Sequence, residues 1–340
     1  MRNRFFWLLA TIMMCGAMMT ALTSCSDSDD NNNNNQKRVA VLLPDDSSLA
    51  RWAVDKANLK AVMDMYGFNT TFYVAPETAE GAAQQVEQLR SVINDGVKYV
   101  VLTAIDYKKI NESGLLEQHP DVKVVCHDRI VLDSPCIAYV SSTDTKEIGR
   151  TQAQFLLNHF HSTGVTPMNI EILEGPETDV NAKDYYDGAM ELLMKYIADG
   201  SLVVQSGKKE YAQVKADSWT VADGKKAMQD RLTAYSNGDC PEMILAANDN
   251  LAQGAIEALK EAGVTTMPVI TGQDNTATAQ EYIKSGKQTM TIDKNLKDMA
   301  YNTAMIVNSL ISNSPIRTSQ SISGIPAIYS KITVMTQDSY

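Results

Sequence analysis

The chain has 340 residues, 44% of them hydrophobic and 21% charged, and its formal net charge at pH 7 is −11. This balance is that of a globular protein and excludes a mainly disordered, collagen-like or coiled-coil chain. The length suffices for two domains of roughly 150 residues, each with a core of its own. The lysines are dispersed and the net charge repels phosphate backbones, so we expect no nucleic-acid partner.

The N-terminus has the pattern of an export signal. Arg2 and Arg4 precede an apolar run that ends at Leu22-Thr23-Ser24-Cys25. A basic start, a short apolar core and small residues describe a secretory signal, although the core is also near the lower length limit of a membrane span. Because Leu-Thr-Ser-Cys resembles a bacterial lipobox, we expect a lipoprotein signal peptide over residues 1–24 and a lipid anchor at Cys25.

Residues 25–37 form the next expected segment, a flexible tether. After Cys25 the segment carries acidic residues and five consecutive asparagines, with no apolar residue to bury. We therefore expect a lipid-anchored protein of the cell envelope, on the periplasmic face or the surface of a Gram-negative bacterium. The acidic residues resemble the surface-export signal of some lipoproteins, and a plain spacer is the alternative, so the membrane leaflet stays open.

From Arg38 onwards, short β-branched runs alternate with amphipathic helical patterns. The first predicted strands are Val39–Leu43, Thr71–Val74, Tyr99–Thr103 and Val122–Cys126. The helices between and after them are Arg51–Tyr66, Ala79–Asn94 and Lys108–Gln118. Such βαβ repetition implies a parallel sheet with helices on both faces.

The same pattern then starts again. Its predicted strands are Asn169–Leu173, Leu202–Gln205, Met243–Ala246 and Val269–Thr271. Its predicted helices are Lys146–His159, Ala182–Ile197, Val221–Tyr235 and Leu251–Ala262. The sequence therefore predicts an α/β fold with two open lobes.

Three cysteines follow the signal and the anchor: Cys126, Cys136 and Cys240. An odd number excludes a complete disulfide framework. Cys126 and Cys136 come from neighbouring predicted strands, so a disulfide between them stays open, while free buried thiols are favoured.

Polar residues follow six of the predicted strands. They are Asp45-Asp46, Asp106, Asp128-Arg129, Asp179-Val180-Asn181, Asn248-Asp249-Asn250 and Gln273-Asp274. Ligands of open α/β sheets bind beyond the carboxyl ends of the strands. Each turn alone is explained by helix capping, but six of them at one edge of two sheets indicate a binding site.

Several of these segments resemble one family of proteins. They are Arg51-Trp52, Asp128-Arg129, Asp179-Val180-Asn181-Ala182-Lys183, the segment 248–256, Gly272-Gln273-Asp274 and the segment 288–294. In their order and spacing the chain resembles the periplasmic sugar-binding proteins of bacterial ABC transporters, in the xylose-binding and multiple-monosaccharide-binding branch. The resemblance covers the chain from Val39 to about Thr333.

The resemblance implies the type I periplasmic binding protein fold, with two Rossmann-like lobes of parallel sheets joined by a three-strand hinge. The N-terminal lobe would comprise residues 38–142 and 294–323, and the C-terminal lobe residues 143–293 and 324–340. The hinge crossings would fall near Val140–Asp144, Thr291–Lys294 and Ser323–Ile328.

The resemblance also implies the ligand-binding residues. On the first lobe they are Arg51, Trp52, Asp106, Asp128 and Arg129; on the second they are Asn181, Trp219, Asn248, Asp249 and Asp274; Lys294 lies at a hinge crossing. These residue types suit a sugar, because Asp accepts from hydroxyls, Asn, Arg and Lys donate to them, and Trp covers the apolar C–H face. Three departures leave the identity of the sugar open: an extra residue between Pro44 and Arg51, Thr143 for an aromatic residue, and His127 for a tyrosine or leucine.

The expected function is binding of a monosaccharide, an aldopentose or aldohexose such as xylose, with hinge closure and delivery to the permease of an ABC transporter. The alternative is a sensor that presents the sugar to a membrane kinase or chemoreceptor, which the sequence does not separate. We expect no enzyme, since the acids have Arg and Asn beside them and no Gly-x-Ser-x-Gly elbow occurs. We also expect no cofactor, no metal and a monomer.

Overall fold

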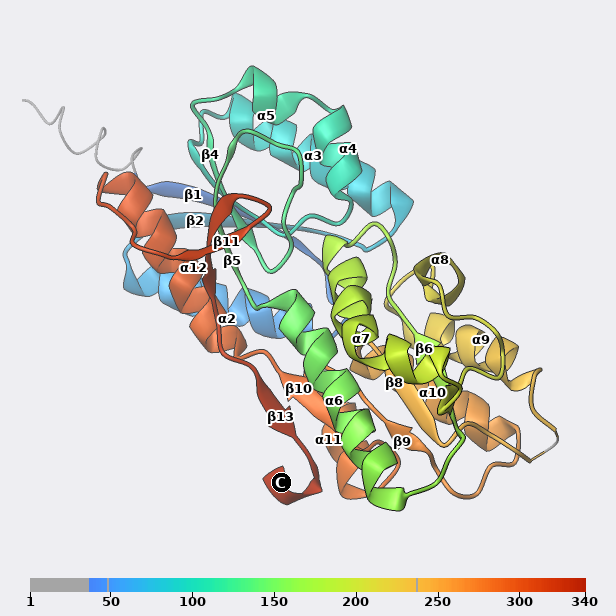
Figure 1. The fold of residues 1–340 in the computed structure, drawn as a ribbon. Coiled ribbons are helices and arrows are strands. Elements are labelled where there is room, and N and C mark those ends of the chain that lie inside the picture. Colours follow the sequence, from blue (N-terminus) through green and yellow to red (C-terminus); the bar gives the residue numbers. More distant parts are fainter. Residues whose placement is uncertain (1–36, 48, 237) are drawn as a thin grey trace, which may run out of the picture.

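The structure is a computed structural model that describes residues 37–47, 49–236 and 238–340. The expected signal peptide (1–24), the lipidated Cys25 and the tether up to residue 36 lie outside the described residues. In the part of the chain that the structure describes, no helix has the length and apolar content needed to cross a membrane. The described chain forms two α/β lobes, as the sequence predicts (Figure 1).

The first lobe is built on a seven-stranded sheet in the order β11-β12-β5-β4-β3-β1-β2. Its strands are β1 (Arg38–Pro44), β2 (Asn69–Ala75), β3 (Tyr99–Leu102), β4 (Lys123–His127), β5 (Ile137–Ser142), β11 (Gln320–Ile322) and β12 (Ile325–Tyr329). All neighbours are parallel except β11 and β12. Its helices are α2 (Arg51–Met65), α3 (Ala79–Asn94), α4 (Tyr107–Glu112), α5 (Leu115–Gln118) and α12 (Leu296–Ile311).

Successive side chains of β1 serve two separate cores, one on each face of the first sheet. Val41 and its alternate neighbours pack with Leu59 of α2 and Ala304 of α12. Leu42 points to the other face and packs with Leu89 of α3. Because both faces are covered by helices, these strands are continuous apolar runs, which is the pattern that the sequence shows.

The second lobe contains a four-stranded parallel sheet in the order β7-β6-β8-β9. Its strands are β6 (Met168–Leu173), β7 (Leu202–Val203), β8 (Met243–Ala246) and β9 (Val269–Ile270), and an antiparallel pair, β10 (Thr291–Asp293) and β13 (Thr333–Met335), lies beside them. Its helices are α6 (Thr145–Thr163), α7 (Val180–Ala198), α8 (Tyr211–Val214), α9 (Val221–Leu232), α10 (Asp249–Glu261) and α11 (Ala277–Lys284), with a 3-10 turn η1 (Gln337–Ser339).

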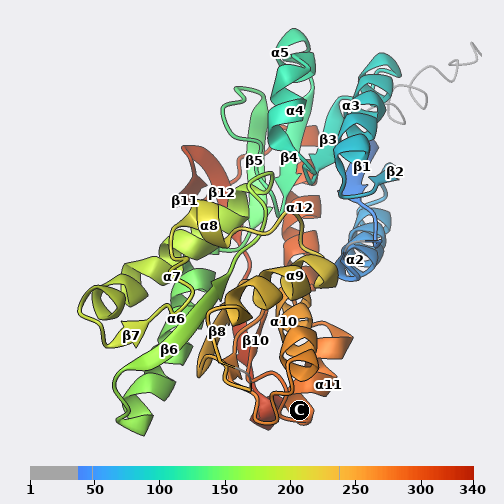
Figure 2. The same cartoon turned by 90° about the vertical axis from the view of Figure 1, so that its right-hand side faces the viewer.

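The chain crosses between the lobes three times: from β5 to α6, from β10 to α12, and from β12 to β13 (Figure 2). The third crossing lies beyond β12, at residues 330–332, and not at the expected Ser323–Ile328. The reason is strand pairing, because β12 is bonded to β5 in the first sheet, with Ala327 opposite Val140. The β12 segment therefore belongs to the first lobe, and the expected assignment of 324–340 to the second lobe is wrong there.

One predicted helix is divided in the structure. The expected helix Lys108–Gln118 forms as α4 and α5, because Gly114 has a left-handed φ of 62° that ends the first of them. Glycine adopts this conformation without the steric cost that a side chain would add.

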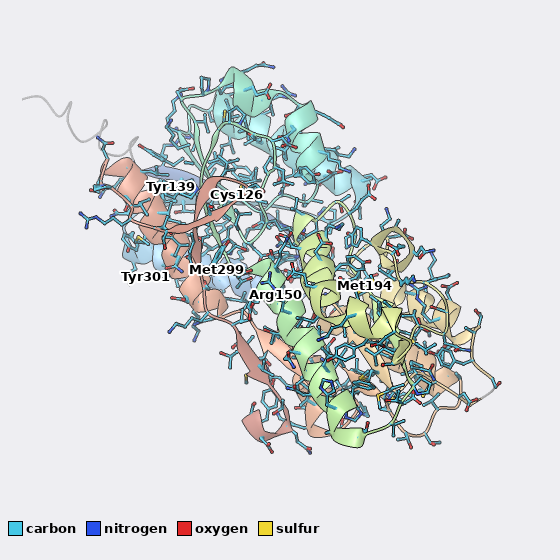
Figure 3. All side chains as sticks on the ribbon, in the orientation of Figure 1. Cys126, Tyr139, Arg150, Met194, Met299 and Tyr301 are labelled. Atoms are coloured by element: carbon cyan, nitrogen blue, oxygen red, sulfur yellow. The ribbon has the colours of Figure 1, made fainter. Side chains whose placement is uncertain are left out.

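The three cysteines Cys126, Cys136 and Cys240 are free thiols. Cys126 belongs to β4 and lies inside the first lobe, fully buried (Figure 3). Burial raises the pKa of Cys126 to about 12, so this thiol is a packing residue and not a reactive one.

Candidate functional site

The loops that follow the strands of the two sheets meet in the gap between the lobes. There, residues of both lobes line a narrow space, which we name the inner cavity. Of the residues expected from the sequence, its lining includes Arg51, Asp128, Arg129, Trp219, Asn248, Asp274 and Lys294. The rest of the lining consists of Leu49, Asp179, Tyr185 and Gln273.

Arg51, the first residue of α2, contacts both lobes. Its guanidinium lies 3.3 Å from Asp128 of the first lobe and 3.3 Å from Asp274 of the second. Asp55, one turn along α2, accepts from Nε and Nη2 of the same guanidinium at 3.0 and 2.8 Å. Burial opposes the charge of Arg51, but these three carboxylates raise its pKa well above the usual value. Arg51 is therefore a fixed cation at the inner cavity.

Lys294 lies at the second crossing between the lobes. Its amino group is 3.4 Å from Asp128 and 3.3 Å from Asp274. Burial and the nearby Arg51 oppose its charge, yet the two carboxylates raise the pKa of Lys294. Burial likewise opposes ionisation of Asp128, but Arg51 and Lys294 hold its pKa below the usual range. Arg51, Lys294 and Asp128 are all charged at neutral pH although each is only 2–5% exposed.

The backbone at both carboxylates is in the left-handed region, with φ of 66° at Asp128 and 96° at Asp274. Non-glycine residues adopt this region rarely, and such strain gathers at functional sites where the surrounding structure holds it. At Asp128 the surrounding bonds are a backbone N–H donated to Ser141 and a backbone carbonyl that accepts from Ser142 Oγ. The carboxylates at both positions lie 3.3–3.4 Å from the cations Arg51 and Lys294.

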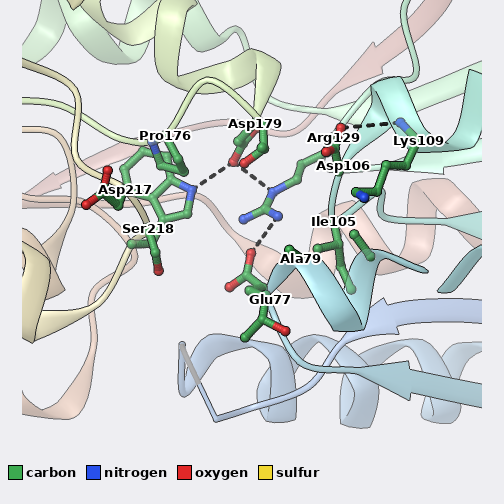
Figure 4. A pocket seen from close by; sticks show the side chains of 14 residues that line it. Glu77, Ala79, Ile105, Asp106, Lys109, Arg129, Pro176, Asp179, Asp217 and Ser218 are labelled. Carbon is green, nitrogen blue, oxygen red and sulfur yellow. Dashed lines mark hydrogen bonds and ion pairs between the residues drawn. The ribbon is translucent and has the colours of Figure 1, made fainter. Parts of the chain in front are cut away.

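Arg129 is the centre of a chain of contacts that spans the gap (Figure 4). Nη1 of Arg129 lies 2.6 Å from Glu77 of the first lobe, and Nε lies 2.7 Å from Asp179 of the second. Trp52 Nε1 donates to Glu77 at 3.1 Å, and Trp219 Nε1 donates to Asp179 at 3.0 Å. The chain thus links the two tryptophans of the described residues through one guanidinium.

The two tryptophans have different places. The Trp219 ring lines the inner cavity and packs so closely on Gly175 that an added Cβ there would lie 2.1 Å from the ring. Trp52 is 1% exposed and does not line the cavity. The guanidinium carbons of Arg51 and Arg129 lie 4.4 and 5.0 Å from its ring centroid. Trp52 therefore supports the cations, and of these two tryptophans it is Trp219 that lines the cavity.

The expected amide residues also separate into two roles. Asn248 lines the cavity, and its Oδ1 caps α10 by accepting from Leu251 N at 2.9 Å, which directs its amide NH₂ group elsewhere. Asn181, which does not line the cavity, donates from Nδ2 to the backbone carbonyl of Asp128 at 3.1 Å. Because Asn181 belongs to α7 and Asp128 to the first lobe, this bond joins the lobes.

Asp249 lies behind the cavity wall. Its carboxylate accepts from Thr291 Oγ1 at 2.7 Å, Gln288 Nε2 at 2.9 Å and Thr276 N at 2.8 Å. Burial, with the charge of Asp274 added, raises the pKa of Asp249 to about 7. The residue joins α10 to the loop before α11 and to β10, so it holds the wall together and does not face the ligand.

Asp106 was expected at the site but lies elsewhere, whereas four residues that were not expected line the inner cavity. Asp106 lines a different space, closer to the surface, and caps α4 by accepting from Lys108 N at 2.9 Å. Asp179 and Gln273 belong to the polar segments after the strands, so the sequence carried the signal for them. Tyr185 follows Asn181 by one helical turn, a spacing that predicts the same helix face. Nothing in the sequence points to Leu49.

Gln273 supplies an acceptor with no partner. Its Oε1 is buried and makes no hydrogen bond within the described residues. Buried polar atoms are normally paired, and an unpaired one at a cavity wall is an open position for a ligand. Together with the cations, carboxylates and the Trp219 ring, the cavity can donate to and accept from several hydroxyl groups at once.

A family model described as a periplasmic binding protein domain matches residues 39–315. The chain is 30% identical to the multiple sugar-binding periplasmic receptor ChvE of Rhizobium radiobacter, over 80% of this chain and 77% of that protein. It is 28% identical to the D-xylose-binding periplasmic protein of Escherichia coli, over 78% and 76%. These relatives are named as binding proteins, in agreement with the expectation that the chain is not an enzyme.

Solved structures share the fold. An ABC transporter solute-binding protein from Clostridium phytofermentans with bound β-D-glucose has a TM-score of 0.83 and 24% identity, covering 89% of this chain and 95% of that one. A carbohydrate transporter solute-binding protein from Chloroflexus aurantiacus in complex with D-glucose has a TM-score of 0.79 and 24% identity, covering 88% and 92%.

Proposed function

Since the chain belongs to the periplasmic binding protein domain family, we propose that it binds a monosaccharide in the inner cavity. The sugar is an aldopentose or aldohexose of the xylose type. The observation that carries the proposal is the lining of this cavity, where two arginines and a lysine alternate with three carboxylates beside the Trp219 ring. This alternation matches a ring of hydroxyl groups, each of which both donates and accepts.

The charges of the cavity supply enough free energy for tight binding. A hydrogen bond to a charged group contributes about 1.5–3 kcal/mol net. Three or four of them reach about 8 kcal/mol, which corresponds to micromolar affinity. The residues are already oriented by protein partners, such as Asp55 behind Arg51, so little side-chain ordering opposes binding.

Binding closes the two lobes on one another. The contacts of Arg51 with Asp274 and of Arg129 with Asp179 join opposite lobes, so they exist only when the gap is closed. A ligand that touches both walls binds the closed form better and shifts the population toward it. The three crossing segments absorb the motion, and hinge closure of this kind is the behaviour that periplasmic binding proteins exemplify.

We further propose that the loaded, closed protein delivers its sugar to the permease of an ABC transporter. It does so outside the cytoplasm, from a lipid anchor at Cys25, as a monomer. Relatives named as periplasmic sugar-binding proteins support the location, and relatives named as ABC transporter components support the partner. One relative is named a receptor, and this name supports a second candidate function, in which the protein presents its sugar to a membrane sensor.

A thermal-shift screen tests the proposed ligand class. The residues from 26 onward, produced without signal and lipid, are heated with xylose, arabinose, glucose, galactose, ribose or allose. A ligand at a hundred times its Kd stabilises the folded state by about 2.7 kcal/mol, which raises Tm by several degrees. We expect this for at least one aldose, confirmed by calorimetry. No shift with any aldose at millimolar concentration would remove the proposal.

A further inference from the structure

A second space lies beside the inner cavity, nearer to the surface (Figure 4). Its volume is about 230 Å³. We name it the outer hollow, defined by Ala79, Ile105, Asp106, Lys109, Pro176 and Ser218. These residues come from loops and helix starts after strands of both lobes, the same sheet edges that form the inner cavity.

The lining of the outer hollow has the two components that a sugar ring needs. Ile105 and Pro176 give it apolar surface, and the edge of Trp219 borders it as well. Asp106 uses Oδ1 to cap α4, which leaves Oδ2 for another donor. Figure 4 shows Lys109 beside Asp106 at the same side of the space, and Ser218 on the opposite lobe.

The two spaces adjoin each other. Arg129, Asp179 and Trp219 line both, so these shared residues form the boundary between the inner cavity and the outer hollow. The Arg129–Asp179 pair joins opposite lobes and forms on closure. A ligand of two units that enters the open gap therefore has to extend from one space into the other beside this pair, along Trp219, which also lines both spaces.

The groove on the other side of the inner cavity is a weaker candidate. It is larger, about 560 Å³, and is bordered by Arg51 and Asp274. However, its lining includes residues of the second crossing, such as Asp293 and Asn295, and none of the described residues that line it is aromatic. A wall that moves with the hinge and has no flat apolar surface suits a sugar ring poorly.

We propose that the outer hollow is a second subsite, which takes the second sugar residue of a disaccharide whose first ring lies in the inner cavity. The proposal rests on the proposed function, since it assigns the first ring to the inner cavity. It widens the ligand class from free monosaccharides to short glycosides. Asp106, expected at the site from the sequence, then contacts the second ring and not the first.

Two matched variants test the subsite. Ala79 and Ala277 are both exposed first residues of a helix, Ala79 at the outer hollow and Ala277 at the groove on the other side. Ala79→Trp fills the outer hollow without touching the inner cavity, and Ala277→Trp is the control. Calorimetry measures wild type and both variants with xylose, glucose and galactose, and with xylobiose, cellobiose, maltose and lactose.

We expect one disaccharide to bind wild type at least as tightly as its component monosaccharide. Ala79→Trp should weaken that disaccharide tenfold or more and change the monosaccharide less than twofold, while Ala277→Trp leaves both within twofold. Monosaccharide binding without any disaccharide binding would overturn the subsite alone. An equal loss of both ligands in Ala79→Trp would overturn it as well. Failure of every sugar on wild type would remove the proposed function, and the subsite with it.

Discussion

The two walls of the inner cavity carry different chemistry. The first lobe presents the guanidinium groups of Arg51 and Arg129 and one carboxylate, Asp128, whereas the second presents the carboxylates of Asp179 and Asp274 and the amide of Asn248. Neither wall is neutral when it stands alone. In the structure, cations of the first wall lie 2.7–3.3 Å from anions of the second, and these are the contacts that the proposed closure would form. Binding and closure therefore depend on the same side chains.

The difference between the walls also fits the proposed sugar ligand. Taking charges out of water is costly, and ion pairs repay this only when additional hydrogen bonds satisfy the remaining lone pairs and protons. A polyol between the walls supplies such bonds to both, because hydroxyl groups donate to carboxylates and accept from guanidinium groups. The walls are complementary to each other and to a polyol, and an apolar ligand would leave their charges unsatisfied.

The largest expected effect comes from removing the cation that joins the walls. Arg129→Ala leaves both Glu77 and Asp179 without their cation in a buried place. Breaking a buried pair in this way costs about 2–5 kcal/mol, so we expect sugar affinity by calorimetry to fall about 100-fold.

The chain offers a matched control for this variant. Arg150 also contacts two acids, Glu191 at 2.7 Å and Glu147 at 3.4 Å, but on the solvent-exposed side of α6. Such exposed pairs contribute little, so Arg150→Ala should change the affinity less than twofold. Equal effects of the two variants would mean that Arg129 acts through general stability and not at the gap.

A smaller decrease in affinity is expected from a change on the second wall. Asp274→Ala removes the carboxylate that faces both Arg51 and Lys294, but Asp128 still contacts each of them. A charged hydrogen bond to the sugar contributes about 1.5–3 kcal/mol, so without this one the affinity should fall roughly tenfold or somewhat more in the same calorimetric assay. An unchanged affinity would show that the sugar does not reach this wall.

Asp249 should make folding stability depend on pH. Its pKa is raised from 3.8 to about 7 in the folded protein, so the folded state holds a proton that the unfolded state releases. The stability present below pH 3.8 is therefore lost as pH rises toward 7, by up to about 4 kcal/mol. Asp249→Asn should flatten this part of the curve of unfolding free energy against pH, between about 4 and 7. An identical slope in both proteins would show that Asp249 ionises normally.

The smallest effect on sugar affinity is expected from His127, which lies behind the first wall of the cavity. His127 is fully buried; its Nε2 lies 3.4 Å from Asp55, which holds Arg51, and its Nδ1 lies 2.8 Å from Thr303 of α12. His127→Phe keeps the ring volume but removes both contacts, and it should weaken sugar binding two- to fivefold. His127→Gln keeps a donor and an acceptor and should restore most of the affinity. A Phe variant that binds as well as wild type would assign His127 to packing alone.

The sequence predicts which residues gather at the cavity better than it predicts what each of them contacts there. Arg51 and Asp128 follow strands of the first sheet and Asp274 follows a strand of the second, each at the carboxyl ends, where ligands of such sheets bind. Trp52 adjoins Arg51 in sequence, but its ring is turned under the cations, and sequence does not fix this orientation. Asp249 adjoins Asn248 in the same segment yet points into the wall, where Thr291 and Gln288 bind it.

The fold was predictable from the sequence where the apolar periodicity of helices and strands is strong. It was not predictable where the pairing of strands far apart in the chain determines which lobe a segment joins. The alternating strands and helices of both lobes follow from apolar patterns. The lobe of β12 depends on its pairing with β5 at Val140–Ser142, which lies far earlier in the chain, and no local pattern reveals this. The division at Gly114 illustrates a left-handed glycine that the sequence admits but does not require.

The most direct test of complementary walls that close on a sugar is small-angle X-ray scattering of the protein with and without the sugar that the thermal screen identifies. We predict that the radius of gyration falls on addition of the sugar, and that Arg129→Ala shows no such fall at the same sugar concentration. Superposable scattering curves for the wild-type protein, at a concentration where calorimetry shows saturation, would contradict closure.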